Sequence, residues 1–334
     1  MSDKVLLAHG SGGRLSHDLI ARHLMPHLEN PILNRLDDSA TFGLNGRIAF
    51  TTDSYVIKPV FFPGGDIGRL AVCGTINDLA TSGAAPKYLS LALIIEEGFP
   101  VGDLERIMSS ISSAAREAGI IIVTGDTKVV DHGSADGIFI NTSGIGVIPE
   151  GVDITGSGAK EGDKIIITGT IGDHGIAVMA QREGLKFSVP VESDCAPLNG
   201  LISDILKVST NVHSLRDPTR GGLATTLNEL ASQSGVGIQI YEDRIPVKDA
   251  VRGMCEILGF DPVYIANEGK MVIIAASEDA DKIIATLREN KYGKDAATIG
   301  EVTSQHKGRV VLKTSLGASR ILDMLTGDLL PRIC

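Results

Sequence analysis

Apolar residues recur at helical and strand-like spacings along the first half of the chain. Residues 67–81 carry apolar side chains at helical spacing, and Leu104, Ile107, Met108, Ile111 and Ala115 share one face of another predicted helix. A helical pattern also covers 15–28. Strands are predicted at 47–53, 88–96, 120–123 and 137–147, where apolar runs are short or alternate.

Residues 149–162 interrupt this pattern with glycine, proline and charge, which indicates a domain boundary. Beyond them, strands are predicted at 164–168, 237–241, 271–276, 297–302 and 309–312, and helices at 175–183, 198–208, 222–234, 247–258 and 280–290. We therefore expect an α/β or α+β fold with domains at 1–150 and 151–322 and a flexible tail at 323–334.

Composition narrows the class of protein. The chain has 334 residues, 43% of them hydrophobic, which is ample for two buried cores. Its net charge of −10, with no block of lysine or arginine, argues against nucleic-acid binding. No apolar run is long enough to span a membrane, and the first residues lack a signal-peptide pattern, so we expect a cytoplasmic protein.

Aspartates recur beside glycine, asparagine or hydroxyl residues. Mg²⁺ prefers oxygen ligands and bridges carboxylates to substrate phosphates. Any one of these aspartates is also typical of an ordinary turn or helix cap, and only the set indicates a nucleotide–metal site. Its members are Asp38, Asp53, Asp78, Asp126 and Asp173.

Three short motifs combine charge with glycine. Residues 125–128 (Gly-Asp-Thr-Lys) predict a tight turn carrying a carboxylate, a hydroxyl group and a cation that suits phosphate, although a plain surface turn has the same pattern. Residues 217–222 place Arg220 at a helix entrance. Glu268 lies between apolar segments, where burial would raise its pKa and make it a base; an exposed loop glutamate is the alternative.

The chain ends in Pro331-Arg332-Ile333-Cys334. Proline biases this segment toward an extended form, and four extended residues reach roughly 13 Å. A terminal thiol on such a segment is what a carrier arm needs, because it can enter a pocket and leave it again. The tail alone fits equally well with an incidental cysteine on a frayed end.

These motifs, in this order, resemble the HypE family of carbamoyl dehydratases of nickel–iron hydrogenase maturation. The resemblance covers essentially the whole chain, and the terminal tetrapeptide is its most specific part. It rests on residues 8–13, 51–56, 61–65, 77–80, 124–130, 172–175, 217–222, 267–270 and 331–334.

The resemblance implies a PurM-like fold, with an N-terminal domain that dimerises through a β-barrel and a C-terminal α+β sandwich domain. ATP and Mg²⁺ would lie between the domains. Cys334 would receive a carbamoyl group from the carbamoyltransferase HypF, ATP-dependent dehydration would give a thiocyanate, and the cyano group would pass to iron on a HypC–HypD complex.

Site residues follow from the same resemblance. Asp38, Asp53, Asp78 and Asp126 would hold Mg²⁺ and ATP, and Lys128 would stabilise charge on the carbamoyl oxygen or the γ-phosphate. Glu268 would take the N–H proton. Further contacts to the nucleotide are expected from Asn77, Gly125, Thr127, Asn141 and Arg220.

Two alternatives remain open at this point. One is a PurM-superfamily enzyme with a diffusible substrate, such as a small-molecule ligase, a kinase or a selenophosphate synthetase. The other is a non-catalytic nucleotide-binding scaffold that docks maturation partners through its tail. The enzymes of the first alternative need no terminal cysteine, and ATP consumption coupled to chemical change on Cys334 separates the second alternative from an enzyme.

Overall fold

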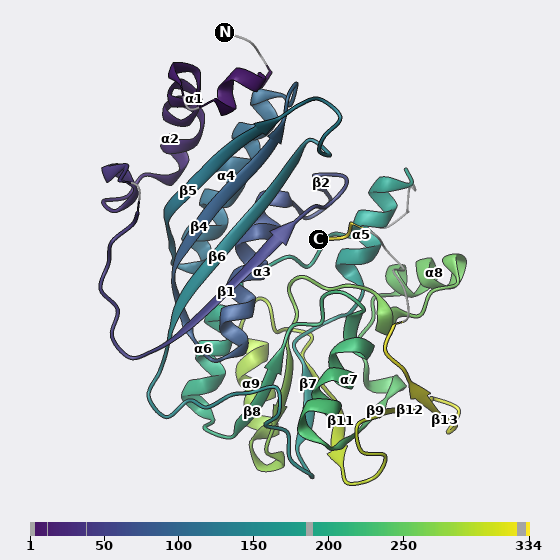
Figure 1. Ribbon diagram of the computed structural model, residues 1–334. Coiled ribbons are helices and arrows are strands. Elements are labelled where there is room, and N and C mark those ends of the chain that lie inside the picture. Colours follow the sequence, from purple (N-terminus) through teal and green to yellow (C-terminus); the bar gives the residue numbers. More distant parts are fainter. Residues whose placement is uncertain (1–3, 12, 38, 185–189, 326–331) are drawn as a thin grey trace.

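The computed structural model describes residues 4–11, 13–37, 39–184, 190–325 and 332–334. Its N-terminal half is a four-stranded sheet of order β1-β6-β4-β5, covered on one face by two helices (Figure 1). The strands are β1 (Arg47–Tyr55), β4 (Ala85–Glu96), β5 (Ile121–Val130) and β6 (Ile138–Ile148), and the helices are α3 (Ile67–Thr81) and α4 (Val101–Ala118). A short hairpin, β2 (Phe61–Phe62) and β3 (Gly65–Asp66), leads into α3.

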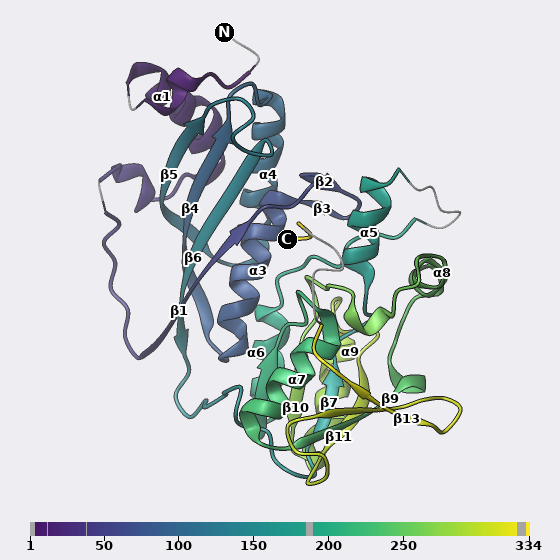
Figure 2. The ribbon, with the colours of Figure 1, turned by 45° about the vertical axis from the view of Figure 1, so that its right-hand side comes forward.

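Apolar side chains at every second position of a strand explain why helices cover one face of the sheet. On β4, Leu89, Leu91, Leu93 and Ile95 are buried against α3 and α4, whereas Ile94 points away and is exposed. Strands with one packed face are expected to alternate in this way. The opposite face of the sheet carries no helix in either view (Figures 1 and 2).

The N-terminal segment packs along the β5 side of this sheet (Figure 1). It consists of η1 (Leu7–Gly10), α1 (Arg14–Leu19), a π-helical stretch η2 (Ile20–Leu24), α2 (Met25–Leu28) and η3 (Leu33–Arg35). The single helix predicted over 15–28 is therefore interrupted by a π-helical stretch just before Pro26, a residue that cannot donate a helical hydrogen bond.

The prediction of a turn at 125–128 is wrong. These four residues continue strand β5, and they pair in parallel with Leu91, Ala92, Leu93 and Ile94 of β4. Gly125 is needed because a Cβ there would lie 2.4 Å from the carbonyl oxygen of Leu91. Glycine therefore marks a close approach between strands here, not a chain reversal.

The C-terminal half is a seven-stranded sheet with helices on both faces. Its order is β13-β12-β9-β11-β7-β10-β8. The strands are β7 (Lys164–Ile167), β8 (Val212–Arg216), β9 (Gly237–Tyr241), β10 (Val272–Ala275), β11 (Ala297–Thr303), β12 (Val310–Lys313) and β13 (Ser319–Leu322). Strands β8 and β13 were not predicted from the sequence.

Two hydrophobic clusters explain the continuous apolar runs of the central strands. Ile165 and Ile167 of β7 pack with α7 (Gly222–Ser234), whereas Ile166 between them packs with α6 (Asn199–Val208) and α9 (Ala280–Glu289) on the other face. A strand buried on both faces loses the alternation of a half-exposed strand. The mixed α+β architecture expected from the sequence is confirmed.

Helix α5 (Asp173–Arg182) lies between the two halves, and α8 (Asp249–Leu258) packs beside it (Figure 2). Short 3₁₀ turns complete the C-terminal half at Glu242–Arg244, Pro262–Tyr264 and Ser277–Asp279. The end of the chain lies beside α5 and the end of β1, so the C-terminal thiol is at the junction of the two halves (Figure 1). No helix among the described residues is long and apolar enough to cross a membrane.

Candidate active site

The last three residues dock in the junction between the two halves. The backbone N–H of Val56 donates to a main-chain oxygen of Cys334 (3.3 Å), and that of Lys58 donates to the carbonyl oxygen of Arg332 (3.2 Å). The Ile333 side chain is 4% exposed and belongs to the hydrophobic cluster that joins the N-terminal half to α5 and α8. Cys334 is thus held half-buried at the junction, although its segment was expected to be flexible.

Four carboxylates gather around this end of the chain, and we call them the acidic cluster: Asp53, Asp78, Asp217 and Glu268. Asp53 lies on β1 and Asp78 on α3, whereas Asp217 and Glu268 lie on loops of the C-terminal half. Burial and then the charges of Asp217, Asp194, Asp53 and Asp78 raise the pKa of Glu268 well above its ordinary value. Burial and the charges of Asp78 and Asp53 raise the pKa of Asp217 to about 7.

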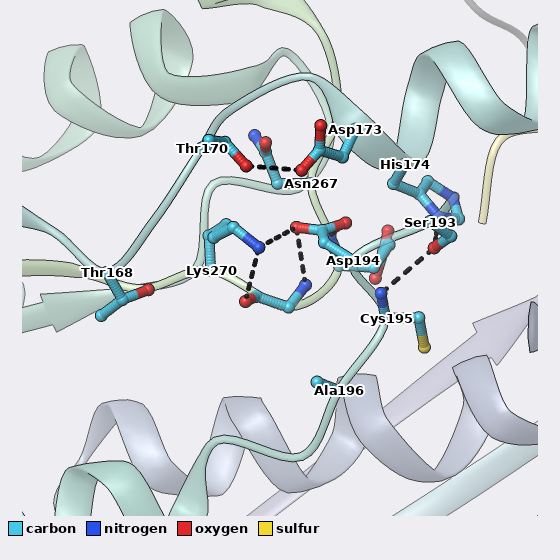
Figure 3. A network of polar contacts seen from close by, with 12 residues as sticks. Thr168, Thr170, Asp173, His174, Ser193, Asp194, Cys195, Ala196, Asn267 and Lys270 are labelled. Carbon is cyan, nitrogen blue, oxygen red and sulfur yellow. Dashed lines mark hydrogen bonds and ion pairs between the residues drawn. The ribbon is translucent and has the colours of Figure 1, made fainter. Parts of the chain in front are cut away.

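Glu268 is buried, and its Oε1 has no hydrogen-bond partner within the described part of the chain. Its main chain, by contrast, is firmly held. Asp194 accepts from the backbone N–H groups of Glu268 (3.1 Å) and Gly269 (3.2 Å) and forms an ion pair with the buried Lys270 (3.1 Å; Figure 3). A rigid backbone therefore presents a carboxylate that is free to exchange a proton.

The thiol of Cys334 is affected by the same charges. Burial and the charge of Glu268 raise its pKa, together with Asp53 and Asp217, and Arg220 acts in the opposite direction. A thiol with a raised pKa stays protonated and is a poor nucleophile. In this docked position Cys334 is suited to present a group already attached to it rather than to attack a new one.

A polar cavity of about 530 Å³ opens next to the acidic cluster, between the two halves. Its lining brings together Asp78 of α3, Asp217 and Arg220 of the 217–222 loop, and Gly156 of the segment between the halves. Arg220 is exposed in this cavity, and Asp78 accepts a hydrogen bond from Thr51 (3.0 Å). The cavity has the size and polarity of a nucleotide site.

The acidic cluster also fits a divalent cation, by its chemistry. Crowded carboxylates with raised pKa values and an unpartnered buried oxygen form a site with uncompensated negative charge, and Mg²⁺ takes oxygen ligands. No three acidic, histidine or cysteine side chains among the described residues are already arranged to hold a metal. Phosphate oxygens would have to supply the remaining ligands, as is usual for Mg²⁺.

Asn77, predicted as a nucleotide contact, makes hydrogen bonds across the two halves of the protein. Its amide donates to the carbonyl oxygens of Ala196 (3.1 Å) and Glu268 (3.2 Å) and accepts from the backbone N–H of Leu198 (2.8 Å). Both amide hydrogens are used within the protein, and the side chain is buried. The structure therefore does not support Asn77 as a nucleotide ligand and makes it a clamp between the two halves.

Asp126 and Lys128 do not join the acidic cluster within one chain. Strand pairing places Asp126 in one row with Ala92, Asn141 and Ser54, on the face that no helix covers, whereas Asp53 faces α3. β5 is three strands away from β1, a separation of about 14 Å at the usual strand spacing. The two side chains instead form an exposed ion pair with each other (2.9 Å), which lowers the pKa of Asp126.

The other predicted residues are placed as follows. Asn141 lies on the uncovered face and donates to the carbonyl oxygen of Asp53 (2.8 Å) and to Ser54 (3.0 Å). Gly125 and Thr127 line a second cavity, of about 380 Å³, beneath the N-terminal segment. Asp38 lies outside the described residues. The structure therefore brings together Asp53, Asp78, Arg220, Glu268 and Cys334 of the predicted set.

Sequence reasoning missed Asp194, Asp217 and Lys270 as site residues. Asp217 could have been included, because it begins the 217–222 motif from which only Arg220 was chosen. Lys270 stands in the 267–270 motif, but nothing in the sequence shows that its side chain is buried. Asp194 belongs to no recognisable sequence motif, and its role depends on a hydrogen bond from Glu268, a residue 74 positions further along the chain.

Comparison with known proteins identifies the family. Residues 36–148 match the N-terminal domain of AIR synthase related proteins, and residues 160–313 match the C-terminal domain. The chain is 50% identical to the carbamoyl dehydratase HypE of Azotobacter vinelandii over 331 residues, which cover 99% of this chain and 97% of that protein. The chain belongs to the HypE family.

Solved HypE structures have the same fold. A HypE crystallised with ATP is 50% identical and superimposes with a TM-score of 0.96, covering 98% of this chain and 99% of that one. The HypE of a HypE–HypF complex is also 50% identical, with a TM-score of 0.82 over 94% of this chain and 100% of that one. The recognition of a HypE from its motifs and the PurM-like fold are confirmed.

Proposed function

We propose that this HypE dehydrates a carbamoyl group carried on the sulfur of Cys334, using ATP. The main support for this proposal is the docked tail, in which the terminal cysteine lies beside Glu268, a buried carboxylate with a raised pKa. Relatives named carbamoyl dehydratase and a HypE crystallised with ATP support the same reaction. The product is a thiocyanate on Cys334, which serves as a donor of cyano ligands to iron in hydrogenase maturation.

The proposed chemistry balances as follows. The γ-phosphoryl group of ATP moves to the carbamoyl oxygen while the nitrogen gives up one proton. The C–O bond then breaks, inorganic phosphate leaves, and the nitrogen gives up its second proton to form the C≡N group. Carboxamide and ATP are thus converted into nitrile, ADP and phosphate. Of the two protons that leave the nitrogen, one ends on the phosphate and one is released, and the phosphate carries away the oxygen atom of the lost water.

Each step has a residue suited to it. Glu268 takes a proton from the nitrogen, since its Oε1 is unpartnered and its pKa is raised. Arg220, beside the 530 Å³ cavity, binds phosphate oxygens. Mg²⁺, held by Asp53, Asp78 and Asp217 together with those oxygens, would lower the barrier to phosphoryl transfer by neutralising charge.

The docked tail also suggests that Cys334 is loaded in one position and dehydrated in another. A half-buried thiol that stays protonated does not attack a carbamoyl donor readily. We propose that Cys334 swings outward to be loaded by HypF, a partner supported by the solved HypE–HypF complex, and inward to be dehydrated. The cyano group is then passed to iron on a HypC–HypD complex. In this proposal the domains are residues 1–150 and 151–322, and the segment that moves is the tail, residues 323–334.

We further propose a homodimer formed through the uncovered face of the N-terminal sheet. That face exposes Ile48, Phe50 and Ile94, three large apolar side chains on a sheet that no helix covers (Figure 2). Two such sheets facing each other make a closed barrel and remove the open edges of β1 and β5. If β5 of one chain lies beside β1 of the other, Asp126 and Lys128 of the partner subunit lie one strand from β1 instead of three, and we propose that they complete the site through the phosphate chain of ATP.

Intact-protein mass spectrometry tests the proposed reaction. The chain is incubated with HypF, carbamoyl phosphate and ATP, desalted, and then given fresh ATP and Mg²⁺. We expect a carbamoyl-sized mass gain on the C-terminal peptide, followed by loss of one water as ATP is consumed. No adduct on Cys334, with HypF shown to be active, would refute the carrier role.

A further inference from the structure

Helix α5 holds the docked tail through a buried histidine. His174 is fully buried at the start of α5, and its Nε2 lies 2.8 Å from the carbonyl oxygen of Ile333. A carbonyl oxygen can only accept, so Nε2 carries the hydrogen and donates it. The ring also makes an edge-on contact with Phe62, with 5.4 Å between ring centroids. Its orientation is therefore fixed from two sides.

The other ring nitrogen connects the tail to the loop that supports Glu268. With its hydrogen on Nε2, the neutral ring accepts at Nδ1 from the hydroxyl group of Ser193 (2.8 Å). Ser193 in turn accepts from the backbone N–H of Cys195 (3.1 Å; Figure 3). Burial lowers the pKa of His174, which keeps the ring in the neutral form that this arrangement requires.

Asp194, which lies between Ser193 and Cys195, accepts hydrogen bonds from the backbone N–H groups of Glu268 and Gly269. The two segments are in close contact, since a Cβ added at Gly269 would lie 1.7 Å from the carbonyl oxygen of Asp194. A continuous set of hydrogen bonds thus runs from the tail carbonyl through His174 and the 193–195 segment to the residue proposed as base.

A second set of contacts from α5 and the N-terminal half holds Arg332. Arg182, at the end of α5, donates to the carbonyl oxygens of Lys58 (2.6 Å) and Arg332 (2.9 Å). The side chain of Arg332 forms an ion pair with Asp136. These contacts are at the exposed surface, whereas the His174 contact is buried and one residue nearer to Cys334, so among the side chains that hold the tail His174 is the better placed to set the depth of the thiol.

We propose that His174 is a positioning residue that latches the inward tail and aligns the group on Cys334 with Glu268. The inference rests on the proposed function only for its effect on dehydration. The latch itself is a property of the docked tail and can be tested without any carbamoyl group. Loss of the latch shifts the tail outward, which exposes Cys334 and favours loading over dehydration.

The test uses His174→Met, which keeps bulk but cannot donate, and His174→Gln, whose amide can reach the same carbonyl oxygen. His213→Gln is the matched control, because His213 is a part-buried histidine paired with Asp163 (2.8 Å) in the C-terminal half. The first readout is the rate of Cys334 alkylation by iodoacetamide in the full-length chain, followed by mass spectrometry of the C-terminal peptide. Far-ultraviolet circular dichroism and the melting temperature verify that each variant is folded.

We expect His174→Met to speed alkylation of Cys334 about fivefold to tenfold, the effect of losing one buried hydrogen bond. His174→Gln should largely restore slow alkylation, and His213→Gln should leave it unchanged. In single turnovers of preloaded protein, His174→Met should slow dehydration by a similar factor, whereas HypF loads it at least as fast as the wild type.

If a folded His174→Met variant is alkylated at Cys334 at the wild-type rate, His174 does not latch the tail. Faster alkylation with dehydration at the wild-type rate would overturn its role in alignment. If wild-type protein receives no carbamoyl group at all, the proposed function fails, and the alkylation rates still decide whether His174 holds the tail.

Discussion

The side-chain amide of Asn77 donates to the main-chain carbonyl oxygen of Glu268, across the junction of the two halves (3.2 Å). Asn77 belongs to α3, directly before Asp78 of the acidic cluster, so one turn of this helix both supplies a carboxylate and holds the backbone of the candidate base. The relative position of the two halves therefore controls the distance between Asp78 and Glu268.

Replacing Asn77 by alanine should release this clamp. The substitution removes three buried hydrogen bonds and leaves backbone groups of Ala196, Leu198 and Glu268 without partners, so we expect the free energy of unfolding to fall by about 2–4 kcal/mol. Urea unfolding of the full chain measures the change. Asn199→Ala is the matched control, because that amide donates one hydrogen bond across the same junction, to Ala118 (2.8 Å), and should cost about 1 kcal/mol. Equal losses in the two variants would contradict the clamp.

Cys334→Ala should abolish carbamoyl loading and leave the fold intact. The backbone contact from Val56 to the terminal residue does not involve the sulfur, and Ile333 remains to anchor the tail. The melting temperature should therefore change by less than about 2 °C. Mass spectrometry after incubation with HypF measures loading. A carbamoyl adduct on this variant would mean that another group is the carrier; Cys73, Cys195 and Cys255 are buried and serve as internal controls.

How much of this site the sequence could predict depends on the range of the contacts. Helix 67–81 and strand 237–241 were predicted with the limits that the structure has, because periodicity is a local signal. Motif resemblance gave Glu268 and Cys334, but not that the chain end inserts beside β1. Gly125 was misread because a close approach to Leu91 and a turn favour the same residue. The face of the sheet on which Asp126 lies depends on how β5 pairs with β4, and no single stretch of sequence encodes that pairing.

Binding of Mg²⁺ and ATP should depend on pH through Asp217. Its pKa of about 7 means that the carboxyl is half protonated at neutral pH, and a cation requires the ionised form. Affinity should therefore rise as the pH rises, by about fivefold between pH 6 and pH 7, with release of about half a proton at pH 7. Calorimetry in two buffers of different ionisation enthalpy measures the proton count. Asp217→Asn should bind more weakly and lose most of this dependence; an unchanged dependence would place the titrating group elsewhere.

Glu268→Gln should load normally, dehydrate slowly and fold more stably. The catalytic loss, about a hundredfold or more, follows from removing a general base. The gain in stability follows from linkage. Because the pKa of Glu268 is higher in the folded chain, its contribution to stability is complete below the unfolded value of about 4.3 and is lost as the pH rises toward the folded value. The amide variant avoids that loss.

The difference in stability between Glu268→Gln and the wild type should therefore widen from pH 5 to pH 8 and reach about 1–3 kcal/mol. Urea unfolding across this range is the measurement. Wild-type dehydration should also speed up with rising pH, whereas the residual rate of the variant should not. A variant that dehydrates at the wild-type rate would remove Glu268 from the mechanism, and a stability difference that shrinks with pH would contradict its raised pKa.

Asp126→Asn should weaken binding of Mg²⁺ and ATP, and Lys128→Ala should slow dehydration, if these residues complete the site of the partner subunit. The dependence on the partner has a decisive test, because Lys128 and Glu268 would then come from different chains at each site. A dimer of one Glu268→Gln chain and one Lys128→Ala chain, each of which dehydrates slowly alone, would contain one intact site. Two affinity tags isolate this mixed dimer.

We expect the mixed dimer to dehydrate the group on Cys334 of its Lys128→Ala chain at about half the wild-type rate per dimer, since one of two equivalent sites is restored. A mixed dimer of Glu268→Gln and Cys334→Ala chains is the control. The tail docks against Val56 of its own chain, so these two changes affect groups within one subunit and should not complement. No activity in the first mixed dimer would place Lys128 and Glu268 in the same chain, which would require β5 to move toward the acidic cluster when ATP binds.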